Sequence, residues 1–111
     1  MNPYTKIAAA KLNAGNDLAL MDGRMLALYR VNDSNDVHYP VWEMHPEGDE
    51  LLVVADGSMS VELRDGEASG LTRLSPHAAF VVPAMTWHRL IVHEPSVLMV
   101  ITPRHNTVHE A

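Results

Sequence analysis

The sequence predicts a single all-β domain, a sandwich or barrel of short strands, on three observations. From residue 18 onward, short apolar runs are separated by turn residues about every eight to twelve positions, as in such folds. In the run 58–64, Met59, Val61 and Leu63 point one way and the residues between them point the other, which is the two-residue period of a strand. The length of 111 residues, 47% of them apolar and 20% charged, suits one domain with one core.

In chain order, the first expected element is a short helix within residues 1–17. Pro3 stands early enough to begin it, Ile7 and Leu12 can share one face, and Gly15 can end it. This helix is expected to lead into the barrel rather than to form part of it.

The β-barrel itself is expected over residues 18–103. Asp56-Gly57 and Asp65-Gly66 predict tight turns between strands, because these residue pairs readily adopt the positive φ that such turns need. Residues 104–111 are expected to form a frayed C-terminal tail. The expected strands cover residues 25–31, 41–45, 50–55, 58–64, 67–74, 78–83, 88–93 and 96–102.

Charge and composition exclude several function classes. The formal net charge is -6 and the pI is about 5.5, which argues against a nucleic-acid or anionic-membrane surface, since both need clustered Lys and Arg. With no cysteine in the chain, a metal must be held by His, Asp or Glu. The N-terminus lacks the apolar core of a signal peptide and no run is long enough to span a membrane, so a cytoplasmic location is expected.

Two of the expected strands carry apolar residues on both faces. They contain the runs LLVV (51–54) and VLMVI (97–101). In a domain this small, a strand that is apolar on both sides indicates that one sheet packs against another chain. The sequence therefore predicts a homodimer.

Several ionisable residues fall at the expected strand ends. Glu43 and His45 are two residues apart and face the same side of a strand, and Glu50 begins the next strand after a turn. Much later, His88 opens a strand after Pro83 has ended the previous one. If these ends converge, His45, Glu50 and His88 supply two imidazoles and one carboxylate. That set is favoured by non-haem Fe(II) and also suits Mn, Zn or Ni.

The spacing resembles the paired motifs of the cupin superfamily. Four residues separate His45 from Glu50, and six separate Glu50 from Gly57, as in the first cupin motif. The interval from Pro83 to His88 fits the second motif. The resemblance, to small single-domain cupins, covers about residues 25 to 103. It implies a jelly-roll β-sandwich or barrel with a divalent metal inside, held by the three matched positions His45, Glu50 and His88.

Three positions depart from the family pattern. Glu43 stands where the first motif has its first histidine, and His77 and Met85 stand where the second motif has glycines. The two glycine positions lie in turns, where a positive φ is usually wanted, so these departures concern loop shape. The replacement at Glu43 concerns the chemistry.

Glu43 has three open interpretations. It is a fourth metal ligand, which would favour harder cations. Or it is a base beside an open metal position. Or it has left the metal and pairs with a side chain such as Arg24 or Arg89, because a buried carboxylate without a partner is costly. For all four residues, the simpler alternative is a barrel that holds no metal, in which they form hydrogen bonds with one another or with water.

Two function classes follow. The first is a small metal-dependent enzyme of the dioxygenase or isomerase type, acting on a small oxygen-rich substrate. The second is a non-catalytic cupin that binds or senses a small molecule, with a degenerate or absent metal site. Packing is expected for Trp42, Met44 and Trp87. The remaining histidines are expected in loops or on the surface: His38, His77, His93, His105 and His109.

Overall fold

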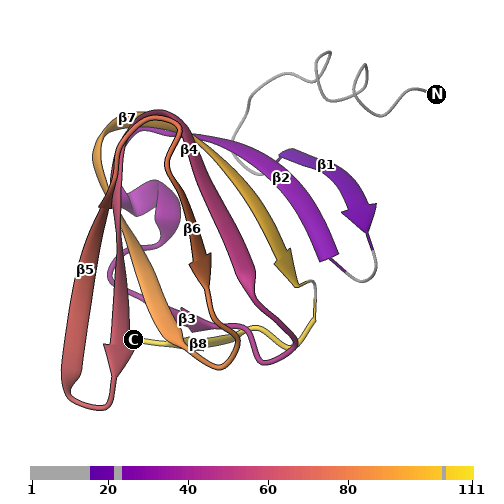
Figure 1. The fold of residues 1–111 in the computed structure, drawn as a ribbon, viewed down its shortest axis with the longest axis vertical. Helices are drawn as coiled ribbons and strands as arrows, with labels where there is room; N and C mark the ends of the chain where they lie inside the picture. Colours follow the sequence, from indigo (N-terminus) through magenta and orange to yellow (C-terminus); the bar gives the residue numbers. More distant parts are fainter. Residues whose placement is uncertain (1–15, 22–23, 104) are drawn as a thin grey trace.

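The computed structural model describes residues 16–21, 24–103 and 105–111, which form an antiparallel β-barrel (Figure 1). The predicted all-β class is confirmed. The N-terminal helix expected from the sequence lies outside the described residues, apart from the two that already belong to the first strand. The elements are β1 Asn16–Met21, β2 Arg24–Val31, the 3₁₀ helix η1 Ser34–Val37, β3 Trp42–Met44, β4 Glu50–Asp65, β5 Ala68–Leu74, β6 Ala79–Val82, β7 Trp87–Pro103 and β8 Val108–Glu110.

Two long strands, β4 and β7, pair along most of their length and run through both layers of the barrel (Figure 1). The first half of β4 and the second half of β7 lie in one layer, where β6 pairs with β4 and β2 pairs with β7. The other halves lie in the second layer, where β5 pairs with β4 and β3 pairs with β7. The space between the layers is the barrel interior.

The prediction of a tight turn at Asp56-Gly57 is wrong. The chain does not reverse there, because register shifts between Val54 and Met59 bend β4 without breaking its pairing with β7. Gly57 has φ 92°, and a Cβ at this position would collide with Pro95 and Ser96 on the neighbouring strand. Glycine therefore serves here to bend one strand from one layer into the next, and the predicted pair 50–55 and 58–64 is a single strand. The turn at Asp65-Gly66 is confirmed, since β4 ends and β5 follows.

The core lies between the layers and is aliphatic. Leu52, Val54, Met59 and Val61 of β4 are fully buried, in agreement with the alternation of the second half of this strand. The inward residues of β2 and β7 complete the cluster, together with Leu74 and Val82. The core occupies the end of the barrel at which β4 and β7 bend, and the other end is left to polar side chains.

The C-terminal segment is not a frayed tail. Residues Val108–Glu110 form β8, which pairs with β3 so that Glu43 stands opposite His109. An ion pair of 2.9 Å between Arg64 Nη1 and Glu110 Oε1 fastens β8 to the second layer. The backbone of β3 joins β7 at one register position, Glu43 with His88, so β8 supplies its other edge.

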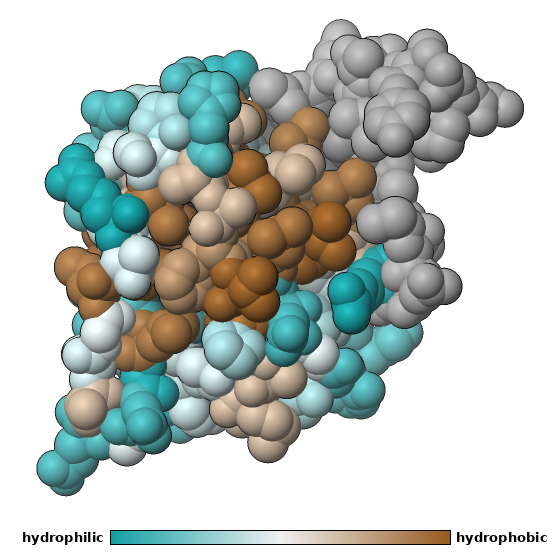
Figure 2. Space-filling model, in the orientation of Figure 1, coloured by the Kyte–Doolittle hydropathy of each residue, from teal (hydrophilic) through white to brown (hydrophobic). Residues whose placement is uncertain are grey.

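One outer face of the barrel is apolar. The outward residues of four adjacent strands are aligned by register: Val81 of β6, Leu51 of β4, Ile101 of β7 and Leu26 of β2 form one row. Figure 2 shows hydrophobic side chains gathered over these strands. Val81 is 53% exposed and extends this apolar row, and it is the contiguous patch rather than a single exposed side chain that is informative. The part of the chain that the structure describes holds no helix that could span a bilayer.

Candidate metal centre

The polar end of the barrel brings together Glu43, His45, Glu50 and His88. Glu43 lies in β3, His45 follows β3, Glu50 begins β4 and His88 is the second residue of β7. Each of the four offers one ligand atom, and these atoms lie within 4.8 Å of one another, so the group could hold a metal ion. His45, Glu50 and His88 are buried, and the Glu43 side chain is 31% exposed.

The contacts within the group all converge on the Nε2 atoms of the two histidines. His45 Nε2 lies 2.9 Å from Glu43 Oε1 and 3.2 Å from Glu50 Oε2. His88 Nε2 lies 3.1 Å from Glu50 Oε1. The two rings are tilted toward one another with centroids 5.2 Å apart. Glu50 therefore bridges the two imidazoles.

The opposite nitrogen of each ring is held by a different group. His88 Nδ1 lies 3.1 Å from the carbonyl oxygen of Thr86, and His45 Nδ1 lies 2.9 Å from Thr107 Oγ1. A carbonyl oxygen only accepts hydrogen bonds, so His88 Nδ1 must donate, and in the neutral ring Nε2 then carries a lone pair. That lone pair faces a carboxylate oxygen, an arrangement that needs either a proton or a metal ion between the two atoms. The donor set thus fits a metal ion bound at the Nε2 atoms, with the Nδ1 atoms fixed as in metal-ligating histidines.

The electrostatics of the group also favour a bound positive charge. Burial acts to lower the pKa of His45, but its hydrogen bonds with Glu43 and Glu50 outweigh burial and raise the pKa to about 9. Burial acts to raise the pKa of Glu50, yet the bonds with both histidines lower it to about 2. Burial likewise opposes the change at Glu43, and the bond with His45 lowers its pKa below the ordinary value. Without metal, a proton on His45 would supply positive charge between Glu43 and Glu50.

Glu43 is paired with histidines rather than with arginine. Its Oε1 faces His45, and its Oε2 lies 3.1 Å from Nε2 of His109 on β8. Of the open interpretations, the one in which Glu43 pairs with Arg89 is wrong, because Arg89 Nε lies 2.6 Å from Glu62 Oε1 and its guanidinium stacks 4.1 Å above the Trp42 ring. Arg24 appears in no ion pair of the described residues, and the Glu43 carboxylate stays with the candidate metal ligands.

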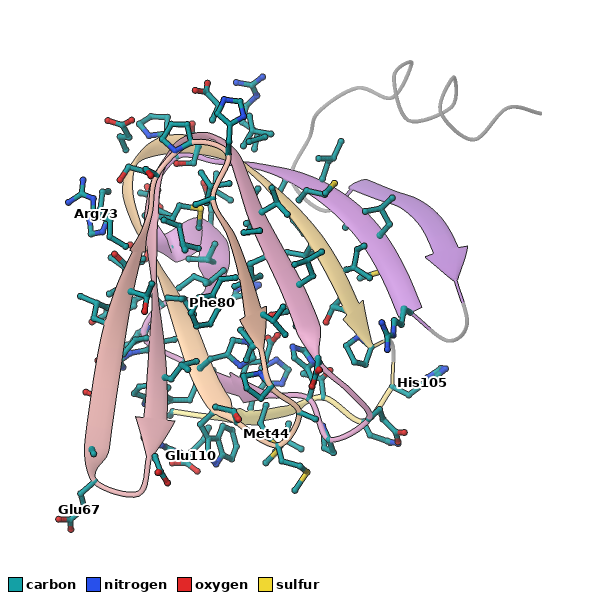
Figure 3. The ribbon with its side chains drawn as sticks, viewed as in Figure 1. Met44, Glu67, Arg73, Phe80, His105 and Glu110 are labelled. Atoms are coloured by element: carbon teal, nitrogen blue, oxygen red, sulfur yellow. The ribbon has the colours of Figure 1, made fainter. Side chains whose placement is uncertain are left out.

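Sequence reasoning missed Thr107 and His109, which contact His45 and Glu43. Both lie in the segment expected to fray, and neither belongs to a motif. The alternation of Thr107 and His109 was the only signal, since two residues that are two apart face the same side of a strand. Of the other histidines, His93 bonds Ser60 Oγ at 2.7 Å outside the group, and His105 points away from the barrel (Figure 3).

A cavity of about 350 Å³ adjoins the four residues inside the barrel. Its walls come from β2, η1, β4 and β7, with β3 and β8 at the polar end. Tyr29, Leu52, Leu90 and Leu98 belong to its lining. A small molecule in this cavity would therefore touch the candidate metal group on one side and aliphatic walls on the other.

No family model and no curated protein matches the sequence, whereas solved structures match it over most of its length. A cupin-2 domain containing protein from Shewanella frigidimarina is 21% identical, with a TM-score of 0.66 over 94% of this chain and 94% of its own. KdgF from Halomonas sp. is 29% identical, with a TM-score of 0.60 over 81% of this chain and 79% of its own. The hydroquinone 1,2-dioxygenase PnpCD, in complex with Cd2+ and 4-hydroxybenzonitrile, is 20% identical, with a TM-score of 0.63 over 94% of this chain and 72% of its own.

Proposed function

We propose, from the premise that this chain is a cupin by fold, that it is a metal-dependent enzyme acting on a small molecule in the barrel cavity. The observation that carries the proposal is the convergence of Glu43, His45, Glu50 and His88 to within 4.8 Å at the wall of a cavity of about 350 Å³. A group of titratable residues beside a concave, mostly apolar pocket is the usual arrangement of an active site.

The four residues suit a first-row divalent metal. Two imidazoles and at least one carboxylate match Fe(II), Mn, Ni or Zn, and the chain has no thiolate that would select a softer ion. Glu43 would be the fourth ligand through Oε1, because this oxygen faces the same Nε2 atom as Glu50 does. Two carboxylates would then offset the charge of the metal.

A bound metal of this kind would supply the chemistry of a dioxygenase, or of an isomerase that polarises a carbonyl. The chain's own residues hold the site in shape. Thr86 and Thr107 fix the two imidazoles, and His109 holds the outer oxygen of Glu43. The aliphatic walls exclude water from the side of the substrate. The likeness to PnpCD, a dioxygenase structure that contains Cd2+, supports the oxidative reaction through fold alone.

A second candidate function is a non-catalytic barrel that binds a small molecule without metal. The observation in its favour is that the four residues satisfy one another's hydrogen-bonding capacity without metal. Within the described residues, no buried side-chain nitrogen or oxygen lacks a hydrogen-bond partner. A protonated His45 between Glu43 and Glu50 makes the same bonds that a metal would replace.

Metal titration separates the two candidates. Protein purified in chelator is titrated with Fe(II), Mn(II), Ni(II) and Zn(II), with His88→Ala as the site variant and His105→Ala as the control. His105 is exposed and points away from the barrel (Figure 3). We expect micromolar or tighter binding of at least one metal, at least a tenfold loss in His88→Ala and none in His105→Ala. Binding weaker than micromolar for all four metals overturns the metal-dependent function in favour of the second candidate.

We also propose that a second copy of the chain covers the apolar outer face. The aligned row of Val81, Leu51 and Ile101, which are exposed or half-buried, supports this, because a two-fold contact lets one such patch serve both partners. Light scattering should give twice the chain mass for the wild type and a lower mass for Val81→Asp. A monomeric wild type contradicts the dimer. The cytoplasmic location stays a prediction, which cell fractionation tests.

A further inference from the structure

The cavity beside the candidate metal group changes from polar to apolar in the same direction along two of the strands that line it, β4 and β7. On β4 the inward residues pass from Glu50 to Leu52. On the second half of β7 they pass from Thr102 through Val100 to Leu98. These strands are antiparallel neighbours, and Leu52 stands opposite Val100 in register, so the two changes coincide in space. Along these two strands, one end of the cavity therefore offers ligand atoms and the other offers aliphatic surface.

The only Arg or Lys in the described lining is Arg89, and its donors are engaged on the outer side of the sheet. Its Nε lies 2.6 Å from Glu62 Oε1, and its Nη1 donates to the carbonyl oxygen of Pro40 at 3.1 Å. Its guanidinium also stacks on Tyr39 and Trp42, at 4.9 and 4.1 Å. Arg89 thus already pairs with a carboxylate and stacks on two rings, so it is not placed to receive an anionic group inside the barrel.

The titratable residues of the lining are mainly acidic or paired. Glu43 and Glu50 belong to the metal group, and Asp36 Oδ2 accepts the backbone N–H of Asn32 at 2.8 Å. His38 and His109 are the exposed histidines of the lining, and His109 is bonded to Glu43. A divalent metal would be matched by the two glutamates, which leaves no surplus positive charge for an anion. Burying a carboxylate or phosphate without a partner is strongly unfavourable.

We infer that the cavity takes a neutral, largely apolar molecule of about one ring, which presents a single oxygen-bearing end to the Glu43, His45, Glu50 and His88 group. The volume of about 350 Å³ lies at the small end of ligand sites. An oxygen-rich molecule such as a sugar would place some of its hydroxyls against Leu52, Leu90 and Leu98, where they find no hydrogen-bond partner. The inference deepens the proposed function by narrowing its substrate class, and it rests on the same site.

Three probes of similar size test the inference: 4-methylbenzyl alcohol, 4-methylbenzoate and myo-inositol. The first two differ in the charge of one end, and the third is neutral and rich in hydroxyls. Binding is measured by amide chemical shifts of the full chain, both metal-free and saturated with Zn(II). We expect the alcohol to bind at least tenfold more tightly than either other probe, with shifts at Leu90 and Leu98. Equal or tighter binding of 4-methylbenzoate or myo-inositol overturns the inference, as does the absence of any shift in the cavity.

A variant that introduces a positive charge checks that the order of affinities among the three probes arises in the cavity. Leu90→Arg places a cation in the lining, and Leu71→Arg makes the same change at a side chain that is 60% exposed on β5, outside it. We expect Leu90→Arg to tighten 4-methylbenzoate binding at least tenfold and Leu71→Arg to leave it unchanged. If Leu90→Arg does not fold, Val41→Arg at the same cavity replaces it. An unchanged preference in a folded cavity variant overturns the inference. If the alcohol binds only in the absence of Zn(II), the inference about the ligand stands, but the metal-dependent function is overturned.

Discussion

Thr107 Oγ1 lies 2.9 Å from Nδ1 of His45, although 62 positions of chain separate the two residues. The contact exists because β8 pairs with β3 and returns the C-terminal segment to the polar end of the barrel. The hydroxyl leaves Nε2 of His45 directed at Glu43 and Glu50. Second contacts of this kind hold a histidine ring in the orientation that a metal needs.

The first prediction concerns this hydroxyl. Thr107→Val keeps the shape of the side chain but removes its hydrogen bond, so His45 loses its orienting partner. We expect metal affinity to fall about 10- to 100-fold, as for other partners of ligating histidines. Calorimetric titration with Zn(II) measures the loss.

Thr107→Ser is the matched control, because it restores the hydroxyl without the methyl group. It should recover most of the affinity. The melting temperature in chelator should be nearly the same in both variants, since Thr107 is only half-buried. Equal affinity in Thr107→Val and wild type would mean that the bond does not position His45.

The second prediction is that the metal-free protein loses stability as the pH rises from about 6.5 to 9. The folded state raises the pKa of His45 from 6.5 to about 9, because Glu43 and Glu50 bind its proton. The resulting stability is fully present below 6.5 and is lost as the pH rises through 9. The upper limit is on the order of 3 kcal/mol, from the size of the shift.

Urea denaturation in chelator at pH 6 to 10 measures this loss, and His45→Asn provides the comparison. The wild type should lose free energy of unfolding across the window while the variant stays nearly level. Saturating Zn(II) should remove the loss, because metal replaces the proton and binds more tightly as His45 deprotonates. A wild-type curve parallel to that of His45→Asn would show that the proton on His45 does not stabilise the fold.

The third prediction concerns the identity of the residue at position 43. If Glu43 is a ligand through Oε1, Glu43→Gln should lower metal affinity at least tenfold, and Glu47→Gln, an exposed change outside the group, should not. Glu43→His introduces the residue that the resembled family has there. It should bind metal but shift the preference toward Ni and Zn, which imidazole suits. Full affinity in Glu43→Gln would instead place Glu43 outside the metal's ligands, as a base or a structural partner.

The sequence predicted the three motif residues of the site because motif spacing is local. His45 and Glu50 are joined by one short turn, and His88 follows a turn whose Pro83 could be read directly. Thr107 and His109 could not be found in this way. Their place depends on β8 pairing with β3, a contact between distant segments that neither composition nor periodicity records.

The difference between local and long-range contacts also explains where the sequence predicted the fold wrongly. The glycine signal at Gly57 was correctly located, yet it was assigned to a hairpin instead of a bend within β4. A glycine with positive φ is compatible with either a hairpin or a bend. Which of the two forms depends on whether the next segment keeps the same partner strand. Here Ser58 continues to pair with β7 at Glu94, so tertiary pairing decides what the local pattern leaves open.

The last prediction concerns Met85, which occupies a glycine position of the second motif and has φ 64°. A left-handed conformation costs a residue with a Cβ about 1 kcal/mol or more. The side chain is 64% exposed, so little packing would be lost with it. Glycine also adds about 0.4 to 1 kcal/mol of freedom to the unfolded chain, so we expect Met85→Gly to raise the free energy of unfolding by at most about 1 kcal/mol.

Ala84→Gly is the matched control, because Ala84 lies in the same turn without a positive φ. There the substitution only adds freedom to the unfolded chain and should cost about 0.4 to 1 kcal/mol. The N–H of residue 85 donates to the carbonyl oxygen of His45 at 3.1 Å, and glycine keeps this bond, so Met85→Gly should not change metal affinity. Urea denaturation of both variants in chelator measures the two changes in the free energy of unfolding. An equal loss in the two would show that the turn at Met85 stores no strain, because glycine would then act at both positions through the unfolded chain alone.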